Sequence, residues 1–128
     1  MMVSTVYHGI LLDVEFENAN FINNFTIFAK RKSTQSEWMI YGVIVDENKI
    51  DETIKAVQKN LRSNKPYYAH FYRNEKLIVV FKEKVFLISI DKTTWTEVIE
   101  YGLSLGIPKE QLDFKPSRFQ DEDTYFSN

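Results

Sequence analysis

The sequence contains no cysteine, and this single absence removes several kinds of chemistry. Disulfides, thiolate zinc sites, iron–sulfur clusters and a cysteine nucleophile all need that residue. Any catalytic or metal-binding role would therefore depend on histidine, acidic or hydroxyl side chains, and the chain has only two histidines, His8 and His70.

Long apolar runs are also missing. The opening residues, MMVSTVYHGILLDVEF, lack a basic region at their start, and Asp13 interrupts their apolar stretch. No segment approaches the roughly 20 apolar residues that cross a bilayer. The sequence therefore predicts a soluble, cytoplasmic protein without a signal peptide or a membrane segment.

Glycine and proline are scarce, with four and three residues in 128. No glycine-rich loop can hold a phosphate and no Gly-x-Ser-x-Gly motif presents a nucleophile, so we expect no cofactor and no nucleotide-dependent chemistry. Without linkers, the chain predicts one domain: N-terminal strands over 1–36, an α/β sandwich over 37–114 and an acidic, aromatic tail over 115–128. That tail is expected either to fray or to pack across the sheet edge.

Neither sign of charge dominates, because the chain has 16 basic and 18 acidic side chains. The only dense basic run is Lys30-Arg31-Lys32, whereas a protein that binds duplex DNA usually has more than one such patch. Single-stranded RNA could stack on tyrosines of an open sheet face. The chain lacks the Lys/Arg-Gly-Phe type of strand motif, so nucleic acid is not the favoured partner.

Hydrophobic periodicity predicts most of the secondary structure. Leu12, Val14 and Phe16 alternate with acids and predict a strand with a wet face that carries Glu15. Further strands are predicted at 25–31, 37–45, 67–73, 76–82 and 85–90. An apolar stripe at spacings of 4, 3 and 4 predicts a helix from Ile50, and a second helix follows Thr94 and ends at Gly106.

This order of elements predicts an α+β fold. We expect an antiparallel or mixed sheet of five to six strands with two helices on one face, in a ferredoxin-like or related two-layer sandwich. In such a fold the second face should meet water, yet three strands are apolar on both faces. Something must cover that face: the N-terminal strands, the C-terminal tail or, as the preferred interpretation, a second copy in a homodimer.

The strand YYAHFYR places Tyr68, His70 and Tyr72 on one face and Ala69 and Phe71 on the other. The first three have aromatic bodies with polar tips, which suits the wetter side of a sheet and also a surface for a ring-shaped ligand or a partner. Tyr41, on an earlier strand, is assigned to the same candidate surface.

Catalysis is the alternative interpretation. His70 or His8 could act as acid and base with support from tyrosine or Asp13. The two histidines do not have the spacing of a metal site, so no metal is expected. Because no convincing catalytic set is present, the sequence favours a non-enzymatic binding or interaction protein that self-associates.

The run TTWTEVIEYGLSLGIPKEQLDFKP, preceded by HFYRNEKLIVVFKEKVF, resembles a small uncharacterised prokaryotic family of single-domain proteins. The resemblance covers much of the chain and implies a complete, independent domain. No activity is attached to that family, so the resemblance assigns no role to any residue.

Overall fold

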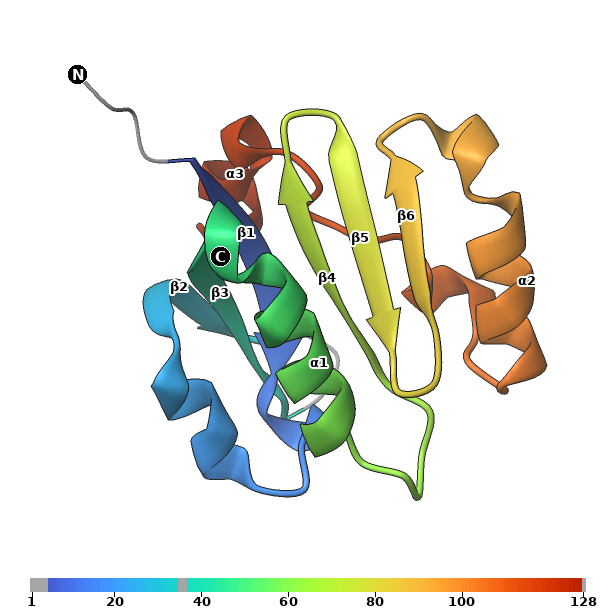
Figure 1. The fold of residues 1–128 in the computed structure, drawn as a ribbon, viewed down its shortest axis with the longest axis horizontal. Helices are drawn as coiled ribbons and strands as arrows, with labels where there is room; N and C mark the ends of the chain where they lie inside the picture. Colours follow the sequence, from blue (N-terminus) through green and yellow to red (C-terminus); the bar gives the residue numbers. More distant parts are fainter. Residues whose placement is uncertain (1–4, 35–36, 128) are drawn as a thin grey trace.

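A computed structural model describes residues 5–34 and 37–127 as one six-stranded antiparallel sheet in the order β2-β3-β1-β4-β5-β6 (Figure 1). The α+β class and the antiparallel sheet predicted from the sequence are confirmed. The strands are β1 (Val6–Leu12), β2 (Thr26–Lys32), β3 (Met39–Asp46), β4 (Tyr68–Arg73), β5 (Lys76–Phe81) and β6 (Val85–Ser89).

The first strand lies in the middle of the sheet, between β3 and β4. It ends at Leu12, so the strand predicted around Leu12 to Phe16 is wrong. Residues 13–15 form a 3₁₀ turn instead, in which the Glu15 carboxylate accepts the Leu12 backbone N–H at 3.0 Å. Glu15 is 3% exposed and therefore does not belong to a wet strand face.

One face of the sheet is covered by α1 (Ile50–Asn60), and we call it the α1 face. Ile54 and Val57 of this helix pack against Val43 and Phe71 of the sheet. A 3₁₀ segment, Ala19–Asn24, adds Ile22 to the same apolar cluster. The apolar stripe predicted for this helix is thus confirmed, and it forms one of the two cores.

The opposite face is covered by α2 (Thr96–Ser104) and the residues after it, and we call it the α2 face. Trp95 and Val98 pack there with Leu77, Val79 and Phe81. The prediction of two helices on one face is therefore wrong, because α1 and α2 lie on opposite faces, and a ferredoxin-like fold is not confirmed. Strands that are apolar front and back are explained by two cores, one on each side of the sheet.

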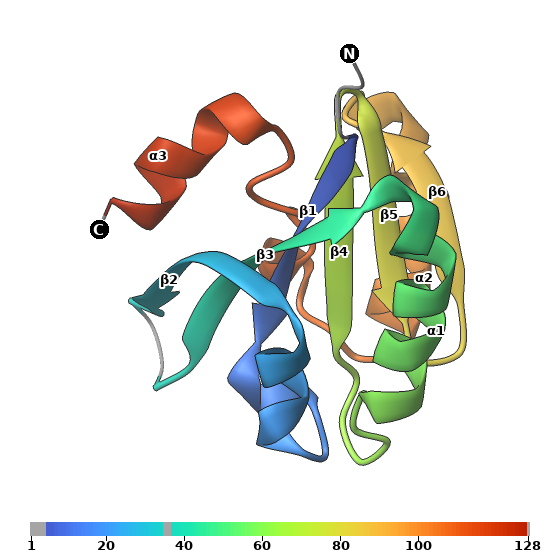
Figure 2. The same cartoon turned by 60° about the vertical axis from the view of Figure 1, so that its left-hand side comes forward.

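The chain after α2 crosses behind β4, β5 and β6 and ends in α3 (Glu122–Phe126), near β2 and β3 (Figures 1 and 2). We call residues 107–126 the C-terminal segment. Its residues Ile107, Leu112 and Phe114 are buried in the core of the α2 face. Of the two alternatives for the tail, the structure shows packing over the sheet, as far as residue 127.

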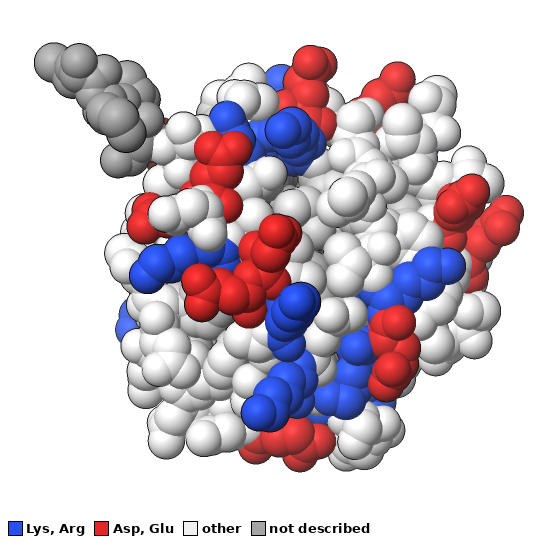
Figure 3. All heavy atoms as spheres, viewed as in Figure 1, with Lys and Arg blue, Asp and Glu red and all other residues white. Residues whose placement is uncertain are grey.

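No helix among residues 5–34 and 37–127 combines the length and the apolar composition that crossing a bilayer requires. The α1 face carries charged side chains of both signs around α1 and at the rim, and an uncharged area lies between α1 and α2 (Figure 3).

Candidate functional site

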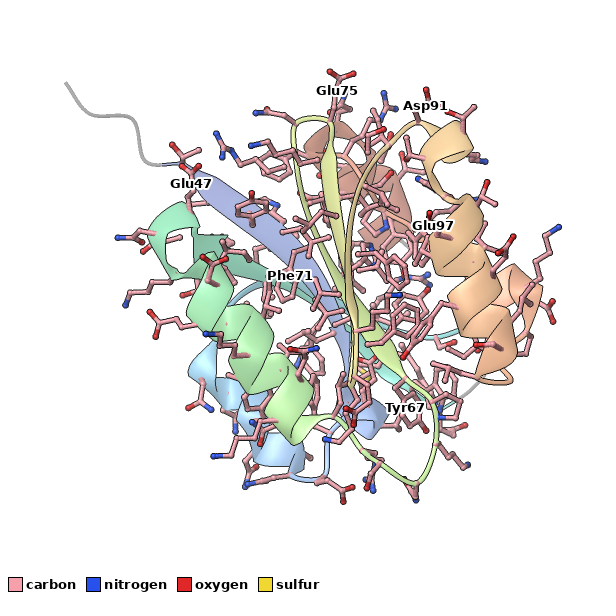
Figure 4. The ribbon with its side chains drawn as sticks, turned by 45° about the vertical axis from the view of Figure 1, so that its right-hand side comes forward. Glu47, Tyr67, Phe71, Glu75, Asp91 and Glu97 are labelled. Carbon is pink, nitrogen blue, oxygen red and sulfur yellow. The ribbon has the colours of Figure 1, made fainter. Side chains whose placement is uncertain are left out.

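Tyr68, His70 and Tyr72 lie on one face of β4, as the alternation predicts, and this is the α2 face. Phe71 points from the other side of β4 toward α1 (Figure 4). The expectation of a wetter side is wrong, however, because His70 is 3% exposed and Tyr72 is fully buried under the C-terminal segment.

Tyr41 does not join this group. It packs at the edge of the core on the α1 face, whereas Tyr68 packs at the edge of the other core. The structure therefore brings Tyr68, His70 and Tyr72 together and leaves Tyr41 on the opposite side of the sheet. The described residues offer no exposed face that presents Tyr41, Tyr68 and Tyr72 together for stacking of bases.

His70 is held in one tautomer by the C-terminal segment. Its Nε2 lies 2.8 Å from the Pro116 carbonyl oxygen, and because a carbonyl only accepts, Nε2 is the protonated nitrogen and donates. Burial lowers the pKa of His70 to about 4, an effect that the bond to Pro116 only partly opposes. At neutral pH the ring is thus uncharged, with Nδ1 as a hydrogen-bond acceptor.

Tyr68 is fixed in the same way, since its hydroxyl donates to the Gln111 carbonyl oxygen. Burial, and then the charge of Asp113, raises the pKa of Tyr68, so the phenol stays protonated. Two polar side chains of β4 are therefore oriented by backbone carbonyls of the C-terminal segment.

A second polar cluster anchors the end of this segment. One oxygen of the Glu122 carboxylate lies 2.6 Å from Nδ1 of His8 and also accepts the Tyr72 hydroxyl. The His8 ring lies between Phe119, at a centroid distance of 3.9 Å, and Phe28, at 4.5 Å. Burial, reinforced by the bond to Glu122, raises the pKa of Tyr72. Nothing in the sequence pointed to Glu122 beyond the acidic, aromatic character of the tail.

A cavity of about 430 Å³ lies between the α2 face and the C-terminal segment. This volume falls within the range of small-molecule sites, about 300–1,000 Å³. Its floor is formed by β1, β3 and β4. Its walls are formed by the C-terminal segment, by Ser33, Thr34 and Trp38, and by the chain entering β4, where Tyr67 lies (Figure 4). The lining includes two cationic side chains, Arg31 and Lys115, and also Ile10, Glu15, Trp38, Ile40, Tyr67, Tyr68, His70, Ile107, Glu110, Asp113 and Tyr125.

Arg31 brings a positive charge to this cavity. Its guanidinium carbon lies 4.4 Å from the centroid of the Tyr125 ring, and its Nε is buried without a hydrogen-bond partner among the described residues. Burial raises the pKa of Tyr125, and the neighbouring Arg31 opposes that rise. The sequence identified Arg31 only as part of a basic run.

Glu15 contributes an acid of unusual character. Burial raises the pKa of Glu15 well above its ordinary value, while the bond from Leu12 N–H opposes the rise. This carboxyl therefore holds its proton more readily than a solvated one does.

Metal ligation has no preformed site in the part of the chain that the structure describes, where three or more His, Asp or Glu side chains nowhere gather. His8 contacts Glu122 and His70 contacts Pro116, so the two histidines have separate partners.

Comparison with known proteins identified no relative of this chain. No family model matches the chain, and the searches of curated proteins and of solved structures returned no match.

Proposed function

We propose that this protein is a non-enzymatic binding domain that holds a small molecule in the cavity between the α2 face and the C-terminal segment. The observation that carries the proposal is the cavity itself, whose floor includes Tyr68 and His70 with both polar groups oriented by backbone carbonyls. Small-molecule sites typically place a few oriented polar groups beside apolar and aromatic side chains, and this cavity combines polar and apolar lining in similar measure. Of the four residues predicted to form the ligand or partner surface, only Tyr68 and His70 line this cavity.

Isoleucine methyl groups provide a direct test. Ile10, Ile40 and Ile107 line the cavity, whereas Ile22 and Ile54 are buried in the core on the opposite face. In a ¹³C-methyl NMR titration with benzoate, benzylamine, benzyl alcohol and imidazole, at least one probe should shift the three cavity signals and leave the two control signals in place. If none of the four probes moves the cavity methyls, or if all five signals move together, the proposal fails.

Acid–base catalysis in the same cavity is the second candidate. It is supported by the coexistence of an uncharged His70, with Nδ1 as a lone-pair acceptor, and a Glu15 carboxyl whose pKa is raised by burial. Hydrolysis of p-nitrophenyl acetate reports an accessible imidazole. A wild-type rate no higher than that of His70→Gln would remove this candidate, and a clearly higher rate would favour it over simple binding.

Self-association is the third part of the proposal. A second copy is no longer needed to cover the α2 face, but Leu87 is 76% exposed on the edge strand β6, opposite Ile78 of the α1-face core. We propose a homodimer that covers this side chain, in a cytoplasmic protein. Sedimentation at micromolar concentration should show a dimer that Leu87→Lys reduces to 15 kDa species, with Ile27→Lys on the other edge strand as control. A wild-type protein that sediments only as 15 kDa species refutes the dimer.

A further inference from the structure

Within residues 5–34 and 37–127, the half-buried guanidinium of Arg31 has the neutral Tyr125 side chain as a neighbour and no carboxylate in an ion pair. None of the ion pairs among the described residues involves Arg31, and its Nε is buried without a partner there. Arginine stays charged at every physiological pH, so its charge cannot be relieved by losing a proton. Partial burial of an unpaired charge is costly, and an incoming anion would offset that cost.

None of the described acids that line the cavity forms an ion pair with Arg31, although the charge of Asp113 acts on Tyr68, His70 and Tyr125. Glu15 is the buried one, and burial favours its uncharged form. Glu110 and Asp113 are exposed, and neither forms an ion pair with Arg31. A ligand with a carboxylate would meet a guanidinium whose planar fork matches its two oxygens, which is the strongest common pairing between these groups.

The remaining walls favour a flat ring. Tyr125 lies under the guanidinium, and the lining also contains Trp38, Tyr67 and Tyr68 above an aliphatic floor that includes Ile10 and Ile40. Aromatic side chains pack well against planar groups in offset or edge-on arrangements. An aliphatic acid would pair with Arg31 but would make less use of these four rings.

His70 adds a polar requirement. Because its Nε2 donates to Pro116, the ring presents Nδ1 as an acceptor, and it lines the same cavity as Arg31. A ligand that also carries a hydroxyl or a ring N–H could donate a hydrogen bond to this nitrogen. The two side chains therefore favour different ligand groups: Arg31 favours an anion that accepts hydrogen bonds, and Nδ1 of His70 favours a hydrogen-bond donor.

We propose that the ligand is a small aromatic carboxylic acid, bound as its carboxylate at Arg31, with its ring among the tyrosines and a hydrogen-bond donor toward His70. This inference rests on the proposed binding function and specifies its ligand class.

The test uses two probes of equal shape and different charge, 4-hydroxybenzoate and 4-hydroxybenzamide. Methyl NMR and calorimetry should show that the acid binds in the cavity roughly tenfold to a hundredfold more tightly than the amide, the effect of one charge-assisted hydrogen-bonded pair. Arg31→Met should remove that preference. Lys30→Met, which removes a neighbouring exposed charge on the same strand, should retain it.

The comparison of acid and amide on the wild-type protein decides the matter even if Arg31→Met does not fold. Equal affinities, or a tighter amide, overturn the carboxylate assignment while leaving the binding function in place, because the cavity methyls still shift. Binding of the acid that survives unchanged in a folded Arg31→Met overturns it as well. If neither probe moves the cavity methyls, the aromatic-acid class is wrong, and the binding function then stands or fails with the four-probe titration.

Discussion

Replacing Glu122 by alanine should weaken the attachment of the C-terminal segment. One carboxylate oxygen serves both His8 and Tyr72, and the hydroxyl of Tyr72 belongs to a side chain that is fully buried. Alanine would leave this hydroxyl without a partner, at a cost of about 1–3 kcal/mol. The pair with His8 is less buried, with side chains 15% and 11% exposed, and adds up to about 1 kcal/mol.

The expected loss is therefore about 1–4 kcal/mol in the free energy of unfolding. With a urea dependence of about 2 kcal/mol per molar for a chain of this size, the midpoint should fall by roughly 0.5–2 M. Asp123→Ala is the matched control, since Asp123 is the next residue in the same helix and is exposed. It should stay within about 0.5 kcal/mol of the wild type.

A double-mutant cycle with Tyr72→Phe tests the stated cause. Phenylalanine removes the hydroxyl that Glu122→Ala strands, so the two losses should not add, and the pair should couple by about 1 kcal/mol or more. If Glu122→Ala costs no more than Asp123→Ala, or if the cycle is additive, then the bridge does not hold the segment in place.

Three further outcomes follow from burial and close packing. Since the pKa of His70 is about 4 in the folded state against 6.5 in an unfolded chain, the unfolded state binds the extra proton between these values. Stability should therefore be fully present above pH 6.5 and fall by up to about 3 kcal/mol toward pH 4, and urea titrations of His70→Gln should show a flatter profile. Glu15 acts in the opposite direction, because its raised pKa keeps it protonated only when folded. Stability should fall as pH rises above about 4.3, and Glu15→Gln should remove that fall. A β-carbon at Gly42 would lie 2.7 Å from the Phe28 ring and 3.0 Å from that of Phe126, so Gly42→Ala should cost about 1–3 kcal/mol and make α3 easier to cleave in limited proteolysis; unchanged cleavage would contradict this contact.

The sequence predicted elements with a clear period. The stripe through Ile54 and Val57 is a helix, and the alternation in YYAHFYR places Tyr68, His70 and Tyr72 on one face. The alternation around Asp13 and Glu15 was misleading. An acidic side chain can lie on the exposed face of a strand, but its carboxylate can equally accept a nearby backbone N–H and stabilise a turn, as Glu15 does here.

The face of the sheet that each helix covers, and the contacts between distant residues, were harder to predict than the type of each element. Strands apolar on both faces carry no mark of which helix covers which face, so α1 and α2 were assigned to one side. The site residues come from distant parts of the chain: His8 and Glu122 are 114 positions apart, and Arg31 meets Tyr125 across the fold. Contacts between such distant residues produce no periodic pattern in the local sequence. The alternation that indicated His70, by contrast, lies within a single strand.

The position of the C-terminal segment has a practical consequence. It provides a wall of the cavity, the carbonyls that orient Tyr68 and His70, and the tyrosine beneath Arg31, yet it is not a strand of the sheet. A chain cut before Ile107 would lose that wall together with the buried core residues Ile107, Leu112 and Phe114, although none of the strand pairings would be cut. If the proposed binding function is right, detachment of this segment from the α2 face would open the cavity and remove Tyr125 from beneath Arg31, so the site depends on a piece of chain that the sheet does not hold by strand pairing.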